Sequence, residues 1–149
     1  MARLYATSKL GDYVVAFKFA TRSRVDDIRK QLKPTQMLGQ ELVKAGILDR
    51  ETCETIALVQ RRIQQTAKNL AKEGVTIVLD EKTFVGEILI ALRFITPTQN
   101  KYWLDHQAAK RARNEDPGRL GELLVDNKVC SAQERDLAMT VQNWLRGRR

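Results

Sequence analysis

One motif of about two dozen residues occurs four times in this chain, and this repetition constrains the fold more than any other feature. The copies align on four glycines, Gly11, Gly39, Gly86 and Gly121. Each glycine follows an aliphatic residue, one of Leu10, Leu38, Val85 and Leu120, and precedes a pair of aliphatic residues. We number the copies repeats 1 to 4, from Lys9, Met37, Phe84 and Arg119. Such repetition is typical of structural units that bury their apolar faces against one another.

Each repeat is predicted to form two helices joined by a tight corner. Good helix N-caps follow the second apolar stretch of every repeat, at Thr21, Asp49, Thr96 and Ser131. Gln99 and Glu134 stand three residues after the last two caps, as in a capping box. Gly46 would end the first helix of repeat 2, whereas Lys18, Arg93 and Lys128 hold that position elsewhere. A left-handed conformation would strain these three residues, so we expect their corners to differ in geometry.

The spacing of the repeats predicts an all-α fold in which they pack as two tandem pairs. The longest interval lies between repeats 2 and 3, so we expect one pair in residues 1–73 and the other in residues 74–149. That interval extends the preceding helix until Gly74 and then reads VTIVLD, where one short strand near Val75–Leu79 is possible. The sequence NEDPG, Asn114 to Gly118, is a turn that separates repeat 3 from repeat 4.

Composition describes a folded, basic chain. A chain of 149 residues with 43% hydrophobic residues can form a core. Its longest apolar runs, such as Ile88 to Leu92, are shorter than the roughly 20 residues of a bilayer-spanning helix, so we expect no membrane span and a cytoplasmic protein. The net charge of +8 favours acidic or phosphorylated partners. Cys53 and Cys130 lack metal-ligand spacing, which favours packed reduced thiols over a disulfide or a metal site.

No pattern of catalytic residues is recognisable. The chain has neither a phosphate loop nor a dinucleotide-binding glycine motif. His106 is the single histidine and has no second histidine with which to bind a metal. Adjacent carboxylates such as Asp26 and Asp27 point in different directions on a helix. We therefore expect a binding protein without enzymatic activity, without a cofactor and without a metal.

Repeat 4, RLGELLVDNKVCSAQERDLAMTVQ, resembles the 24-residue unit of the MshE N-terminal (MshEN) domain family, which is found at the front of bacterial type II secretion and type IV pilus ATPases. That unit opens with Arg-Leu-Gly and closes on Gln, and two in tandem bind cyclic di-GMP. Repeats 2 and 3 also close on Gln, whereas repeat 1 ends on Leu32. The resemblance implies two degenerate domains of this type, acting as a signalling adaptor of a secretion, pilus or motility system.

The resemblance also implies a set of ligand-binding residues. In the family, the opening Arg and closing Gln engage guanine, and the opening Leu and Gly let the ligand approach the backbone. Arg supplies a planar donor fork for guanine O6 and N7. The best candidates for binding cyclic di-GMP are Arg119, Leu120, Gly121, Leu124, Gln142, Val85, Gly86 and Gln107. Weaker candidates come from the first pair: Leu38, Gly39, Gln60, Lys9, Leu10 and Gly11.

Only repeat 4 has the opening Arg, which leaves alternatives open. The other repeats open with Lys9, Met37 and Phe84, so the N-terminal pair could instead be a scaffold or a docking surface. The apolar candidates could serve packing alone, and Arg119 could pair with Glu115 or Glu122. One alternative function is a nucleotide-independent protein-interaction module. Another is nucleic-acid binding through basic and aromatic residues, which no recognised motif supports.

Overall fold

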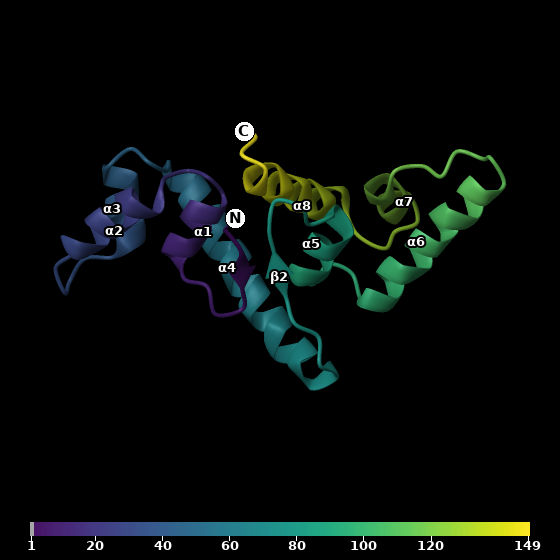
Figure 1. Cartoon of the computed structure of the whole chain (residues 1–149), viewed down its shortest axis with the longest axis horizontal. Helices are drawn as coiled ribbons and strands as arrows, with labels where there is room; N and C mark the ends of the chain where they lie inside the picture. Colours follow the sequence, from purple (N-terminus) through teal and green to yellow (C-terminus); the bar gives the residue numbers. More distant parts are fainter. Residues whose placement is uncertain (1) are drawn as a thin grey trace. The chain divides into compact units, whose positions relative to one another are not determined.

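The computed structural model describes residues 2–149 and is mostly helical. Each repeat forms a short first helix and a longer second helix, which confirms the predicted all-α fold (Figure 1). The eight α-helices in these residues are α1 (Leu10–Ala16), α2 (Arg22–Lys30), α3 (Leu38–Lys44), α4 (Arg50–Leu70), α5 (Val85–Ala91), α6 (Pro97–Ala112), α7 (Leu120–Asp126) and α8 (Ala132–Leu145). A 3-10 turn, Ala71–Glu73, and a left-handed Gly74 follow α4, so the helical stretch ends at the predicted glycine.

The second helix of every repeat begins at the predicted cap residue. The side chains of Thr21, Asp49, Thr96 and Ser131 each accept a hydrogen bond from the amide three residues later, over 2.7 to 3.2 Å. The carboxylate of Glu134 accepts from the amide of Ser131 in return, and the side chain of Gln99 accepts from that of Thr96. Since these bonds satisfy amides that a helix leaves unpaired, local chemistry fixes where the four helices begin.

The corners between the paired helices share one geometry in all four repeats. The φ angle is 62° at Lys18, 75° at Gly46, 66° at Arg93 and 58° at Lys128, all in the left-handed region. In repeat 4, the amide of Lys128 donates to Val125 O and that of Val129 to Leu124 O, which is a Schellman motif. The expectation that Lys18, Arg93 and Lys128 form different corners is wrong, because tertiary packing imposes the glycine-type conformation on ordinary residues.

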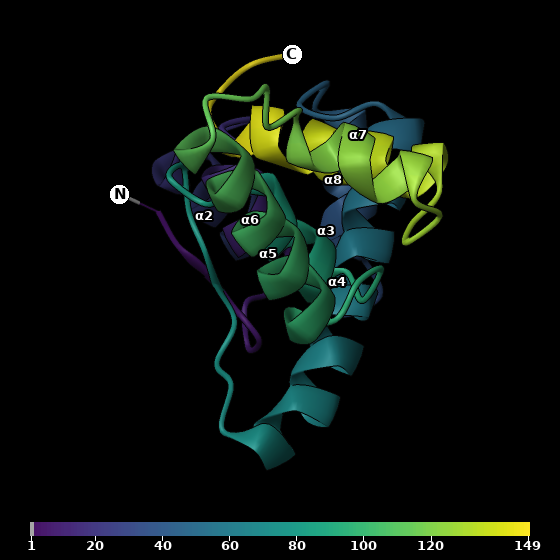
Figure 2. The ribbon, with the colours of Figure 1, turned by 90° about the vertical axis from the view of Figure 1, so that its right-hand side faces the viewer.

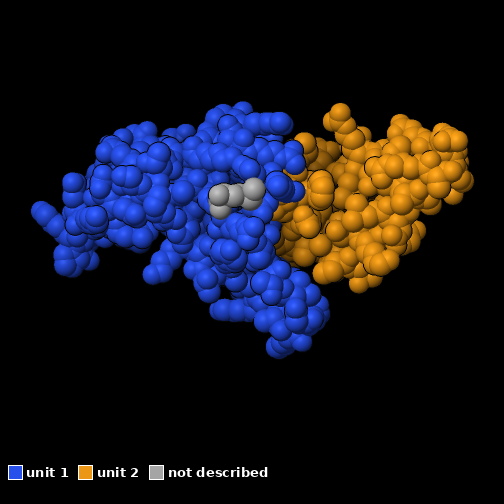
Figure 3. All heavy atoms as spheres, in the orientation of Figure 1, with its two compact units in different colours: residues 1–82, 143–149 blue, residues 83–142 orange. Residues whose placement is uncertain are grey.

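Unit 1 comprises residues 1–82 and 143–149 and contains repeats 1 and 2 (Figure 3). Its helices α1, α2, α3 and α4 pack against one another. Two short antiparallel strands, β1 (Leu4–Tyr5) and β2 (Val78–Leu79), pair Leu4 with Leu79. The predicted strand near Val75–Leu79 is therefore present, and its partner β1 was not predicted. In Figures 1 and 2 the last turns of α4 extend past the other helices of unit 1 before the chain returns to β2.

The carboxyl-terminal residues complete the core of unit 1. The Trp144 ring lies 5.3 Å from that of Phe17 and 5.4 Å from that of Phe19, between ring centroids. The Arg149 guanidinium lies 4.0 Å from the Phe19 ring centroid and donates to Lys18 O over 2.8 Å. These contacts join residues far apart in the sequence, which is why residues 143–149 belong with the first two repeats.

Unit 2 comprises residues 83–142 and contains repeats 3 and 4. Its helices α5, α6 and α7 contact one another around buried residues such as Leu89, Leu92 and Leu124. From the sequence we placed the boundary between residues 73 and 74, and in the structure the division falls between Lys82 and Thr83. Gln107 is the single buried residue of α6, and the side chains of Tyr102 and Leu104 are exposed.

The closing glutamines tie the repeats together in pairs. The side-chain amide of Gln107, which closes repeat 3, donates to Gly118 O just before repeat 4, over 2.8 Å. Gln142, which closes repeat 4, donates in turn to Thr83 O just before repeat 3, over 3.2 Å. In unit 1, Gln60 of repeat 2 donates to Ser8 O just before repeat 1, over 3.2 Å. The repeats therefore pack as two tandem pairs, as predicted.

No helix among residues 2–149 combines the length and the apolar character that crossing a membrane requires.

Candidate functional site

A groove of about 400 Å³ lies in unit 2, beside the start of repeat 4. Its walls come from the opening segment of α7, from one face of α8 and from the start of α5. This volume is within the range of small-molecule sites, roughly 300 to 1,000 Å³. The lining residues are Val85, Arg119, Leu120, Gly121, Glu122, Arg135, Asp136, Met139 and Gln142.

This groove brings together five of the eight residues that the sequence singled out most strongly, namely Arg119, Leu120, Gly121, Gln142 and Val85. The other three, Leu124, Gly86 and Gln107, do not line it. Leu124 is fully buried, and Gln107 is buried and donates to Gly118 O. At Gly86 an added Cβ would collide with the side chain of Asn100 and lie 3.0 Å from Leu120 Cδ2, so this glycine permits close helix packing.

Two charged side chains in the groove have no partner within residues 2–149. The guanidinium of Arg119, the N-cap residue of α7, makes no hydrogen bond or ion pair there, and neither does the carboxylate of Glu122; both residues are exposed. Glu115 instead pairs with Arg113 over 3.0 Å, so the predicted alternative partners of Arg119 do not engage it. Arg135 is paired with Asp136 over 3.0 Å. The groove thus offers one unengaged guanidinium fork and one unengaged carboxylate.

Gln142 faces this groove with part of its amide already in use. Its Nε2 donates to Thr83 O over 3.2 Å, so the donor end of the side chain holds the chain just before α5. Gln60 and Gln107 are bound in the same way, to Ser8 O and Gly118 O. The closing glutamines therefore have a structural role in each pair, and the Gln142 amide keeps its oxygen and its second N–H for a ligand.

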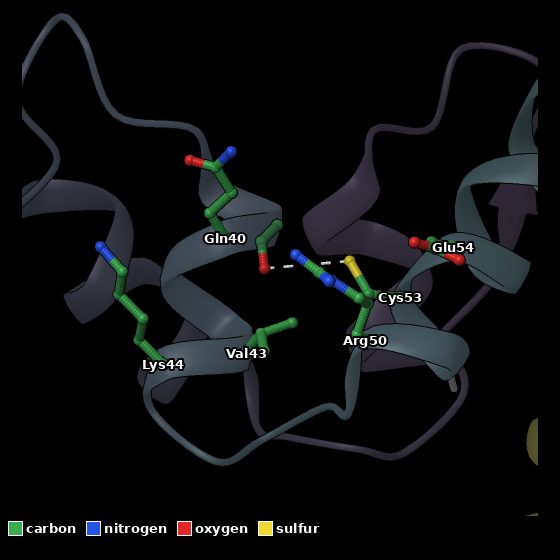
Figure 4. A pocket seen from close by; sticks show the side chains of 7 residues that line it. Gln40, Val43, Lys44, Arg50, Cys53 and Glu54 are labelled. Carbon is green, nitrogen blue, oxygen red and sulfur yellow. Dashed lines mark hydrogen bonds between the residues drawn. The ribbon is translucent and has the colours of Figure 1, made fainter.

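A second groove, of about 510 Å³, lies in unit 1 between α3 and the start of α4 (Figure 4). Of the weaker candidates, Gly39 lines it, while Leu38 and Gln60 do not. Arg50 reaches into it from the first residue of α4, as Figure 4 shows. Sequence reasoning missed Arg50, because the candidate ligand-binding residues were taken from the opening motif, the aliphatic pair and the closing glutamine of the repeats.

Cys53 forms part of the wall of this second groove. Its thiol is half-buried and lies 3.8 Å from Gly39 O, at hydrogen-bond distance for sulfur. Burial, with a smaller contribution from the neighbouring Glu54 charge, raises the pKa of the Cys53 thiol. The group is therefore a protonated thiol at neutral pH. Cys130 is also a free cysteine and is buried.

The candidates of repeat 1 serve packing and capping. Leu10 packs close to Gly39, where an added Cβ would lie 3.3 Å from Leu10 Cδ2. The amide of Lys9 donates to the Asp12 carboxylate over 2.8 Å, and Asp12 also pairs with Arg22 over 2.8 Å. Gly11 is buried beneath Val25 and Arg29.

The two grooves define what the chain can do chemically. Within residues 2–149 no group of three or more His, Cys, Asp or Glu side chains is placed to hold a metal ion, and His106 lies against the Trp103 ring with 5.1 Å between centroids. No family model matches the chain, and no curated protein or solved structure matches it either. Both grooves combine an arginine, a carboxylate and apolar walls, which suits recognition of a planar polar ring.

Proposed function

We propose that the chain is a non-catalytic receptor for cyclic di-GMP that acts as an adaptor in a bacterial secretion, pilus or motility system, with the nucleotide held in the groove of repeat 4. The observation that carries this proposal is the pair of unengaged charges, Arg119 and Glu122, in a groove of about 400 Å³. The resemblance of repeat 4 to the MshEN unit motivates the choice of nucleotide. A cytoplasmic location is part of the proposal.

Guanine chemistry complements these two side chains. Its O6 and N7 atoms accept hydrogen bonds, which suits the planar donor fork of Arg119. Its N2 amino group donates, which suits the carboxylate of Glu122, an acceptor when ionised. Met139 and Leu120 supply apolar surface for the face of the base. Adenine carries an amino group in place of O6 and would leave the arginine fork without its second acceptor.

Calorimetric titration of the full chain with cyclic di-GMP tests the proposal. Arg119→Ala should weaken binding by roughly ten- to hundredfold, since a bidentate base contact is worth about 1 to 3 kcal/mol. Glu122→Gln should also weaken it. Arg111→Ala is the matched control, because Arg111 is exposed on α6 and does not line the groove. Absence of heat at high micromolar ligand, or equal affinity for cyclic di-AMP, would overturn the proposal.

A second candidate function is a nucleotide-independent protein-interaction module, and the surface of α6 favours it. Tyr102 is 63% exposed and Leu104 is 45% exposed on this helix. Exposed large apolar side chains are among the features of protein-binding surfaces. Pull-downs from cells with and without cyclic di-GMP discriminate between the two functions. Equal partner recovery that is lost in Tyr102→Ser but kept in Arg119→Ala would favour the interaction module.

A further inference from the structure

The two grooves occupy the same place in repeats 2 and 4. Gly39 and Gly121 are equivalent in the alignment, and both line their grooves. The next wall position along the second helix is Cys53 in one groove and Arg135 in the other, each lying against its glycine at 3.2 Å from an added Cβ. The groove of repeat 2 therefore lies at the position equivalent to the proposed site.

The arginine in this second groove comes from a different position of the repeat. Met37, the opening residue of repeat 2, does not line the groove and is 67% exposed. Arg50, the first residue of α4, lines it from the opposite wall. The equivalent residue in repeat 4 is Ala132, the first residue of α8. Each groove thus contains one arginine side chain without a partner among residues 2–149, from the opening position in repeat 4 and from the start of the second helix in repeat 2; the other arginine of the repeat 4 groove, Arg135, is paired with Asp136.

A carboxylate accompanies the arginine in both grooves. Glu54 lines the groove of repeat 2, on the same helix as Arg50 (Figure 4). Neither the guanidinium of Arg50 nor the carboxylate of Glu54 forms a hydrogen bond or ion pair within residues 2–149. They reproduce the unengaged donor fork and acceptor of Arg119 and Glu122, while Lys44, paired with Glu41 over 3.3 Å, adds positive charge at the edge.

We infer that the groove of repeat 2 is a second binding site for a guanine nucleotide, in which Arg50 and Glu54, from other positions of the repeat, play the roles of Arg119 and Glu122. The identity of the ligand rests on the proposed function, and the site itself rests on the geometry of repeat 2. Val43 and Cys53 provide the apolar wall on which the base lies. The chain therefore binds two nucleotide ligands, one in each unit.

Cys53 gives this site a reporter of its own, because its thiol lines the groove. The rate of its alkylation by N-ethylmaleimide is measured by mass spectrometry with and without cyclic di-GMP. Cys130, which is buried at 7% exposure and lies outside both grooves, is the internal control. A ligand in the groove should slow Cys53 modification at least severalfold and leave the rate at Cys130 unchanged.

Variants separate this site from the one at Arg119. Arg50→Ala should abolish the protection of Cys53 and reduce the calorimetric stoichiometry from two ligands to one. Arg50→Lys should retain only part of the protection, since lysine lacks the planar donor fork. Arg119→Ala should remove the other ligand and keep the protection. Arg61→Ala, an exposed position of α4 outside the groove, should behave as wild type.

Two results would overturn the inference. A stoichiometry of one that Arg119→Ala abolishes, with Cys53 unprotected, refutes the second site and leaves the proposed function standing. Protection of Cys53 that persists in Arg50→Ala refutes the role of Arg50. Protection of Cys53 that persists in Arg119→Ala supports the second site. If the titration of that variant also shows no loss of heat, only the proposed role of Arg119 is refuted.

Discussion

Exchanging glycine and lysine between two corners should shift stability in opposite directions. Lys128 has a φ of 58° and Gly46 a φ of 75° at equivalent positions of the repeats. A left-handed conformation costs an L-residue about 1 to 2 kcal/mol. Glycine avoids this cost. It also loses more backbone entropy on folding, which offsets the gain in stability by about 0.4 to 1 kcal/mol. Lys128→Gly should therefore raise the free energy of unfolding by roughly 0.5 to 1 kcal/mol, and Gly46→Lys should lower it similarly.

Side-chain contacts contribute little to this comparison. An added Cβ at Gly46 meets no atom within 4 Å, so the cost of a side chain there is conformational. Lys128 is exposed and makes no side-chain hydrogen bond or ion pair within residues 2–149. Lys128→Ala removes the long side chain without changing the backbone preference. It is the matched control and should leave stability near the wild-type value.

Urea denaturation followed by circular dichroism measures the effect. For a slope of about 2 kcal/mol/M, a change of 0.5 to 1 kcal/mol moves the transition midpoint by roughly 0.25 to 0.5 M. In single-tryptophan variants, Trp103 reports on unit 2 and Trp144 on unit 1 by fluorescence. Identical midpoints for Lys128→Gly and Lys128→Ala would refute the reasoning, since they would show that the corner conformation carries no strain.

Three further predictions follow from single contacts. Gln107→Leu removes the hydrogen bond to Gly118 O and should lower the free energy of unfolding by about 1 to 2 kcal/mol in urea titrations, and an unchanged midpoint would contradict the pairing role. Tyr13→Phe removes a buried hydroxyl that has no partner in residues 2–149, so thermal unfolding should show equal or higher stability, and a marked loss would reveal a hidden partner. Burial raises the pKa of Asp12, but its hydrogen bonds, including one from Arg22, outweigh this and hold the pKa below the ordinary 3.8. The stabilisation is thus present above about pH 4 and is lost as the pH falls through the folded-state pKa, and Asp12→Asn should flatten acid denaturation curves in that range.

The helix starts and the pairing of the repeats were predictable because they depend on local chemistry and on repetition. Cap residues such as Asp49 act within one turn, so their effect can be predicted from a short stretch of sequence. The left-handed corner at Lys18 was not predictable from its residue type, because tertiary packing overrides a local preference of only about 1 to 2 kcal/mol. Strand β1 escaped prediction because its two residues carry almost no periodic signal.

Some residues of the candidate site were likewise predictable from the sequence, and others were not. The alignment of the opening motifs pointed to the groove at Arg119, because Arg119, Leu120 and Gly121 are adjacent in sequence and line the same groove. The role of Gln107 differed from expectation because its hydrogen bond to Gly118 O depends on how two repeats face each other. Arg50 could have been found by asking which charged residues project from the first turn of each second helix toward the preceding corner.

The crossed glutamine bonds make the pair, and not the single repeat, the smallest complete building block. Gln107 and Gln142 each fasten the start of the other repeat, so both such contacts are used up within unit 2. An open solenoid instead leaves a free stacking face at each end and grows by one repeat at a time. A lengthened version of this protein would therefore be expected to gain repeats two at a time, because a reciprocal pair of glutamine bonds needs both repeats.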